Sequence, residues 1–219
     1  MDRKKVGIVI FPMVEVLDFC GPFEVFSVTR LTEGLNPGDP SPFEVLLVAE
    51  TAAAVTTTGG MQVAPHTTFD ACPPLDIMVV PGGWGARAEM KNPAMLDFVK
   101  QQAAGVETLT SVCTGSLVLG NAGLLDGLRA TTHWRSLGMM QEKFPRITVD
   151  RESHVVEDGR VWSRTGACSP PRASPPASTW RSRWSRATME RRSRARPRAT
   201  WSIRIRIRTS GGWRYKKFA

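Results

Sequence analysis

The chain has 219 residues and a formal net charge of +9, and its length suits one α/β domain with a well-filled core. Its four cysteines stand at unrelated spacings, which argues against a zinc site and a secreted disulfide framework, and no motif indicates a cofactor. No apolar run approaches the roughly 20 residues of a membrane span. The N-terminal MDRKK is not typical of a signal peptide. We therefore expect a cytoplasmic protein that makes no membrane contact and binds no metal or cofactor.

The positive charge is concentrated at one end of the chain. Residues 1–163 hold 13 Lys+Arg against 19 Asp+Glu, a net of −6, whereas residues 164–219 hold 16 against 1, a net of +15. A basic composition typical of nucleic-acid binding is thus confined to the tail. We expect an α/β domain at residues 1–162 and an Arg/Pro/Ser-rich tail at 163–219. No nucleic-acid partner is expected apart from any that the tail binds.

Short apolar runs typical of buried parallel strands lie at 5–11, 43–50, 76–80 and 107–112. Helical spacing occurs at 14–29, 93–104, 117–125 and 136–144. A hairpin or an excursion off the sheet is predicted at 56–65, a hairpin at 155–162, and short strands at 130–132 and 147–150. The Gly21-Pro22 pair predicts that the first helix begins at Pro22, with Asp18 in the preceding loop. This alternation predicts one doubly wound parallel sheet, which binds ligands at the carboxyl ends of its strands.

Cys113 stands at the turn between a predicted strand and a predicted helix. The turn reads Cys113-Thr114-Gly115-Ser116, and its strand-to-helix geometry is that of a nucleophile elbow, although the motif is not G-x-S-x-G. A helix N-terminus favours negative charge, so we expect a lowered pKa and a nucleophilic thiolate. The alternative is a small buried hydrophobic residue, the commonest role of a free cysteine.

Two further features are predicted to share the edge of the sheet with Cys113. Gly82 and Gly83 follow the strand at 76–80 directly, and glycines at such a position mark backbone that another group approaches closely. Asp18 lies in the loop after the first strand. The alternatives are a tight turn for the glycines, and a helix N-cap or first-turn acid for Asp18.

Three separated segments carry a family likeness: FPMVEVLDFCGPFEVF, DIMVVPGGWGA and TSVCTGSLVLGNAGLLDGLRATTHW. Together they resemble the ThiJ/PfpI superfamily, which is related to class I glutamine amidotransferases. Within it they look most like isocyanide hydratases and the amidase-like domains fused to some transcription regulators. The likeness covers about residues 6–161. It implies a flavodoxin-like fold, a homodimer, and a cysteine nucleophile at Cys113.

Residue by residue, the resemblance places the acidic partner of the nucleophile on Asp18, the PGG loop on Gly82 and Gly83, and the residue after the nucleophile on Thr114. Asp18 would then be a proton carrier with a raised pKa. The backbone N–H groups of Gly83 and Thr114 would stabilise developing negative charge. Peptidase-like members have a histidine directly after the cysteine, and Thr114 at that position argues against a Cys-His protease.

His133 is a secondary candidate, because it follows the short strand at 130–132, although a histidine at a strand end is more often structural. The resemblance implies hydration of an isocyanide to an N-substituted formamide through a thioimidate on Cys113. One alternative is a glyoxalase-like enzyme that attacks a 2-oxoaldehyde with the same thiol, assisted by His133. The other is a non-catalytic ligand-sensing domain of a transcription regulator.

The tail departs from the family pattern. Family members ordinarily continue with a glycine-rich turn and a helix, whereas this chain has four prolines within 169–176 and then an Arg-rich segment. We hypothesise a reading-frame shift near Val161. The alternative is a genuine basic arm that binds nucleic acid.

Overall fold

The computed structural model describes residues 3–29, 40–166, 203–209 and 212–218. The segments Asp2–Ser27 and Phe43–Pro170 belong to one compact unit. The expected domain boundary at residue 162 falls inside a strand of this unit, and most of the tail, residues 167–202, lies outside the described residues.

Seven strands of the described residues form the main sheet, in the order β10-β11-β7-β6-β1-β2-β5. Neighbouring strands are parallel except in the β10–β11 hairpin. The bounds are β1 Lys4–Val9, β2 Phe43–Ala49, β5 Thr67–Thr68, β6 Ile77–Val80, β7 Thr108–Val112, β10 Val155–Asp158 and β11 Val161–Arg164. The predicted doubly wound parallel sheet is therefore confirmed.

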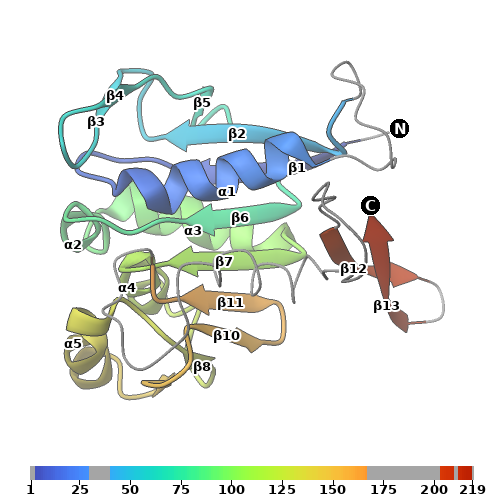
Figure 1. The fold of residues 1–219 in the computed structure, drawn as a ribbon. Helices are drawn as coiled ribbons and strands as arrows, with labels where there is room; N and C mark the ends of the chain where they lie inside the picture. Colours follow the sequence, from blue (N-terminus) through green and yellow to red (C-terminus); the bar gives the residue numbers. More distant parts are fainter. Residues whose placement is uncertain (1–2, 30–39, 167–202, 210–211, 219) are drawn as a thin grey trace, which may run out of the picture. The chain divides into compact units, whose positions relative to one another are not determined.

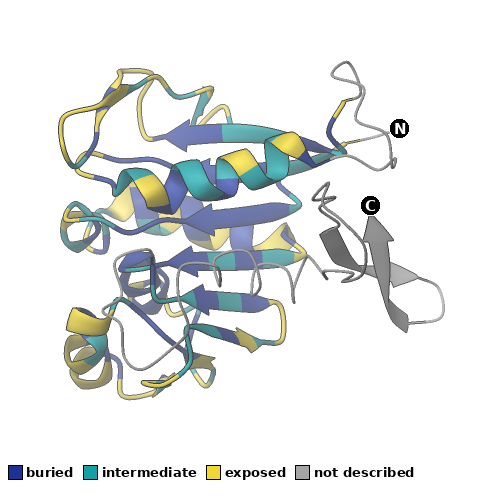
Figure 2. Cartoon of the chain, in the orientation of Figure 1, coloured by how far each residue is buried: buried dark blue, intermediate teal, exposed yellow. Residues whose placement is uncertain are grey.

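Helices cover both faces of this sheet. α1 (Val16–Val28) lies on one face, and α3 (Pro93–Gly105) and α4 (Gly115–Asn121) lie on the other (Figure 1). The chain steps from β1 to β2 in one direction across the sheet and from β6 to β7 in the other, so right-handed crossovers place the connecting helices on opposite faces. Figure 2 shows that the central strands are buried between these layers. Their almost continuous apolar sequence follows from burial on both faces.

The predicted start of the first helix is wrong. α1 begins at Val16 and continues through Pro22, so Asp18 lies in its first turn and not in a preceding loop. A proline ring normally displaces the preceding residue from helical geometry, in part by contact with the Cβ of that residue. Gly21 has no Cβ, so this contact is absent. The early start buries Asp18, which is 2% exposed.

Smaller elements surround the sheet. The predicted hairpin at 56–65 is confirmed by the antiparallel pair of β3 (Val55–Thr56) and β4 (Gln62–Val63). The short strands predicted at 130–132 and 147–150 occur as β8 (Arg129–Ala130) and β9 (Thr148–Val149), which pair with each other outside the main sheet. The remaining helices are α2 Ala86–Glu89, η1 Trp134–Ser136 and α5 Leu137–Lys143.

The described residues after 202 form a hairpin. β12 (Ile203–Thr209) and β13 (Gly212–Phe218) pair antiparallel and belong to the second unit of the chain. The alternating IRIRIR of β12 has the two-residue period of a strand. In the described part of the chain, none of the helices combines the length and apolar character that crossing a bilayer requires.

Candidate active site

The backbone of Cys113 is held in a sparsely populated conformation. Its φ is +54°, which is unfavourable for a residue with a side chain. Three hydrogen bonds fix this turn. The Cys113 N–H donates to the carbonyl of Arg164 at 2.8 Å, and the Cys113 carbonyl accepts from the hydroxyls of Ser116 and Thr132, each at 3.1 Å. The sharp strand-to-helix turn predicted from the sequence is therefore present, with Cys113 between β7 and α4.

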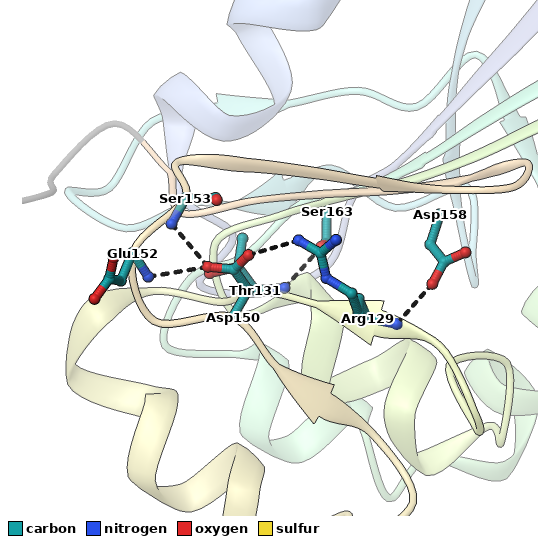
Figure 3. A network of polar contacts seen from close by, with 7 residues as sticks. All are labelled: Arg129, Thr131, Asp150, Glu152, Ser153, Asp158 and Ser163. Carbon is teal, nitrogen blue, oxygen red and sulfur yellow. Dashed lines mark hydrogen bonds and ion pairs between the residues drawn. The ribbon is translucent and has the colours of Figure 1, made fainter.

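A polar network holds the segment from Arg129 to Thr131, which leads to Thr132 (Figure 3). The Arg129 guanidinium donates to the Asp150 carboxylate at 2.9 Å, and the Arg129 N–H donates to the Asp158 carboxylate at 2.9 Å. The Thr131 N–H donates to Ser163 Oγ on β11 at 2.8 Å. These bonds join the segment from Arg129 to Thr131 to Asp150, directly after β9, and to the β10–β11 hairpin, and so position the next residue, Thr132, against the cysteine.

Glycines allow the backbone to approach Cys113 closely. A Cβ on Gly82 would lie 2.7 Å from the Cys113 Cβ and 2.6 Å from the Thr114 nitrogen. A Cβ on Gly166 would lie 2.7 Å from the Cys113 Cβ and 3.2 Å from its sulfur. Real side chains do not pack at such distances, so both positions require glycine. The Gly82 contact gives a physical reason for the Pro-Gly-Gly sequence, whereas Gly166 carried no recognisable signal.

Two hydrogen bonds join the Gly83 backbone to the Thr114 hydroxyl. The Gly83 N–H donates to Thr114 Oγ1, and the same hydroxyl donates to the Gly83 carbonyl, each at 3.1 Å. Gly83 has a φ of +131°, and a Cβ there would lie 2.4 Å from the Met13 carbonyl oxygen. The Gly83 N–H thus points at a hydroxyl in this structure. Its assignment to an oxyanion hole stays a prediction, and it requires Thr114 to release this bond.

Asp18 lies beside the sulfur of Cys113 and forms a hydrogen bond with it. Burial and the negative charge of Asp18 raise the pKa of the Cys113 thiol from 9.0 to about 12, although hydrogen bonds from the Thr114 N–H and hydroxyl act to lower it. The expected lowering of this pKa is therefore wrong. A helix terminus contributes about 0.3–1 kcal/mol, less than the roughly 1.4 kcal/mol of a single pKa unit, so it does not offset these two effects.

Arg164 is a residue of this site that the sequence did not suggest. It is half-buried, and burial lowers the pKa of its guanidinium to about 10, while the charge of Asp18 acts in the opposite direction. The side chain stays positively charged at neutral pH. Sequence reasoning placed Arg164 in the atypical tail, but it ends β11 and its carbonyl binds the Cys113 N–H.

Cys113, Asp18, Gly83 and Thr114 line a cavity of ≈ 200 Å³. Its wall contains five of the six residues predicted from the sequence, namely Asp18, Gly83, Cys113, Thr114 and His133. The sixth, Gly82, packs directly behind Cys113 and Thr114. The structure therefore brings together every candidate that the sequence identified.

His133 takes part in local structure as well as in the cavity wall. Its Nδ1 accepts the Arg135 N–H at 3.4 Å, which caps the helical turn η1. Four further residues line the cavity: Glu15, Trp84, Arg87 and Arg135. Glu15 and Trp84 lie within the family-like segments but were given no role, and Arg87 and Arg135 lie just outside those segments. Within the described residues, no group of three or more His, Cys, Asp or Glu side chains is placed to bind a metal ion.

Two named proteins are similar to this chain in sequence. The chain is 39% identical over 163 residues to isonitrile hydratase of Pseudomonas putida, an alignment that covers 74% of this chain and 65% of that one. It is 35% identical over 112 residues to the HTH-type transcriptional regulator GbdR of Pseudomonas aeruginosa, covering 51% of this chain and 30% of the regulator. The chain thus spans just under two thirds of the first relative and less than a third of the second.

The crystal structure of a THiJ/PfpI family protein from Pseudomonas syringae superposes with a TM-score of 0.64 and 31% sequence identity. The superposition covers 75% of this chain and 63% of that protein. Residues 4–172 match the DJ-1/PfpI family. The chain therefore belongs to the DJ-1/PfpI family, with the flavodoxin-like fold that the resemblance implied.

Proposed function

We propose that the protein is a cysteine-dependent hydratase that converts an isocyanide to an N-substituted formamide. The observation that carries this proposal is the hydrogen-bonded pair of Cys113 and Asp18 at the base of a cavity. The 39% identity to isonitrile hydratase supports the choice of substrate class, because isonitrile and isocyanide are two names for one functional group.

In the first step the sulfur of Cys113 bonds to the terminal carbon of the isocyanide. The same carbon gains the thiol proton, so an S–H bond is replaced by one S–C and one C–H bond, and a thioimidate forms. Asp18 carries this proton from sulfur to carbon. With a thiol pKa of about 12, Cys113 is protonated at neutral pH. The pair therefore already holds the proton that the addition consumes.

In the second step water adds to the thioimidate carbon, and its proton passes to the nitrogen. The C–S bond then breaks as the carbonyl of the formamide forms, and the sulfur regains its proton through Asp18. Thr114 assists both steps, because its N–H donates to the sulfur as negative charge develops there. Its hydroxyl adds a second donor when it turns from the Gly83 carbonyl to the sulfur. The net reaction adds one water to one isocyanide.

Two alternative functions each have one supporting observation. His133 on the cavity wall favours attack on a 2-oxoaldehyde with histidine assistance. The 35% identity to GbdR favours a ligand-sensing domain. Family membership also supports the proposal of a homodimer, which light scattering on the purified chain tests directly.

The test is to incubate purified protein with an aryl isocyanide and, separately, with methylglyoxal. The hydratase predicts formamide from the isocyanide alone, no turnover by Cys113→Ala, and a loss of about 10²–10⁴ in Asp18→Asn. Cys72→Ala is the matched control, since Cys72 lies outside the cavity. Turnover of methylglyoxal alone contradicts the hydratase. Tight binding of a ligand without turnover of either compound supports the sensing domain.

A further inference from the structure

The outer part of the cavity carries two arginines, each stacked on an indole. The Arg87 guanidinium lies 5.3 Å from the Trp84 ring centre, and the Arg135 guanidinium lies 4.8 Å from that of Trp134. Arg87 also donates to Ser136 Oγ at 3.5 Å. We call these four residues, Trp84, Arg87, Trp134 and Arg135, the rim.

Neither rim arginine forms an ion pair with a carboxylate in residues 3–29 or 40–166. A guanidinium held over an indole keeps N–H groups available to an anion, although one N–H of Arg87 already donates to Ser136 Oγ. The rim therefore presents two oriented positive charges without an anionic partner from the described protein.

Burial changes from the base of the cavity to the rim. Asp18 at the base is 2% exposed and Cys113 is half-buried, whereas Trp84 is 65% exposed and Trp134 is 40% exposed. A ligand whose reacting group contacts the sulfur consequently extends its other end toward the two arginines. One end of the ligand thus reacts with the sulfur, and the rim selects the ligand by the charge of its other end.

We propose that the substrate carries a carboxylate, which Arg87 and Arg135 bind while its other end reaches Cys113. A planar guanidinium matches a carboxylate with two parallel hydrogen bonds, and the indole of Trp84 offers an apolar surface to the body of the ligand. The nature of the reacting end, an isocyanide, rests on the proposed function. Charge selection at the rim does not depend on it.

Glu15 provides an internal test of this charge selection. It lines the same cavity and bears the opposite charge. Removing that charge strengthens binding of an anion, and removing either arginine weakens it. The two changes therefore move the same measurement in opposite directions.

The first experiment alkylates Cys113 with iodoacetate and with iodoacetamide, which differ mainly in the presence of a carboxylate. In each reaction the sulfur displaces iodide and forms an S–C bond. Peptide mass spectrometry measures both rates at Cys113, and the rate with iodoacetate is divided by the rate with iodoacetamide. This ratio is then divided by the same ratio for N-acetylcysteine. We expect this normalised ratio to fall at least about fivefold in Arg87→Gln and in Arg135→Gln and to rise in Glu15→Gln. Arg151→Gln, an exposed arginine outside the cavity, is the matched control.

The second experiment compares hydration of 4-isocyanobenzoate with that of its methyl ester. The wild type is expected to prefer the carboxylate, and both Arg→Gln variants to lose that preference. Charge selection in alkylation without turnover of either isocyanide retains the rim assignment and refutes the hydratase. The opposite result is turnover of both isocyanides together with a normalised alkylation ratio that no rim variant alters. That result overturns the rim assignment and retains the hydratase.

Discussion

The inner wall of the cavity and its rim are built in different ways. The inner wall consists of Gly82, Gly83, Cys113 and Thr114. It is held by hydrogen bonds between the Thr114 hydroxyl and the Gly83 backbone and by contacts where a single Cβ does not fit. The rim consists of long, largely exposed side chains that stack in pairs. The difference implies that the wall determines the chemistry at sulfur and tolerates almost no change, whereas the rim is free to vary with the ligand.

The largest effect on stability is expected from Gly83→Ala. The new Cβ would lie 2.4 Å from the Met13 carbonyl oxygen on a backbone with φ of +131°, so strain and overpacking together destabilise the fold by about 3 kcal/mol or more. Urea unfolding measures the change. Gly138→Ala in α5 is the control, since a Cβ added there would meet no atom within 4 Å. A helical Gly→Ala change there stabilises by roughly 0.5–1 kcal/mol.

Equal, small effects of these two alanine substitutions would contradict the view that the wall is tightly constrained. A large loss at Gly83 with a gain at Gly138 would support it. The same pair of variants also separates strain in the wall from a general intolerance of alanine.

An intermediate effect is expected from Thr114→Val. The hydroxyl that binds both the N–H and the carbonyl of Gly83 is removed, which costs about 1–2 kcal/mol of stability. The hydrogen bonds from Thr114 act to lower the pKa of Cys113, so loss of the hydroxyl raises that pKa further and slows alkylation at neutral pH. Thr114→Ser retains the hydroxyl and should restore both properties. A Thr114→Val protein that alkylates faster than the wild type would contradict this role.

The smallest effect is expected from Asp150→Asn in the network of Figure 3. Hydrogen bonds from the Ser153 and Glu152 N–H groups and from Arg129 lower the pKa of Asp150 to about 2, although partial burial opposes them. Its contribution to stability is therefore present above its unfolded pKa, near 3.8, and is lost as the pH falls toward about 2. Arg129 is 58% exposed, so solvent limits the loss in Asp150→Asn to about 1 kcal/mol.

The pH dependence of unfolding measures this contribution. The difference between wild type and Asp150→Asn should shrink between about pH 4 and about pH 2. Asp97→Asn, an exposed change on α3, is the control measured over the same pH range. A difference that grows as the pH falls would contradict the assignment.

The sequence predicted the inner wall better than the rim. Cys113, Gly82 and Gly83 could be found because each follows a buried strand directly, where the parallel sheet itself fixes their position. Arg87 and Arg135 could not, because they lie on short helices or turns whose orientation depends on packing. The start of α1 was missed because Gly21-Pro22 usually marks a helix start and here lies within the helix.

The pKa of Cys113 was mispredicted for a related reason. The strand-turn-helix pattern shows where the cysteine lies in the chain, but burial depends on the surrounding fold. Asp18 was expected in a loop, and its placement on the first turn of α1 brings a buried charge against the sulfur. Arg164 was assigned to the tail because its neighbours in sequence are tail-like, although its strand pairs with β7.

The account rests on Asp18 and Cys113 acting as one proton-sharing pair. The direct test is the rate at which iodoacetamide alkylates Cys113 from about pH 7 to about pH 10, in wild type and in Asp18→Asn. The wild-type rate should rise throughout this range without a plateau, because the pKa of the thiol is about 12. Removing the charge of Asp18 should lower that pKa and accelerate alkylation at every pH, even though turnover is lost. A plateau below about pH 9 in the wild type, or an Asp18→Asn protein that alkylates no faster, would contradict the account.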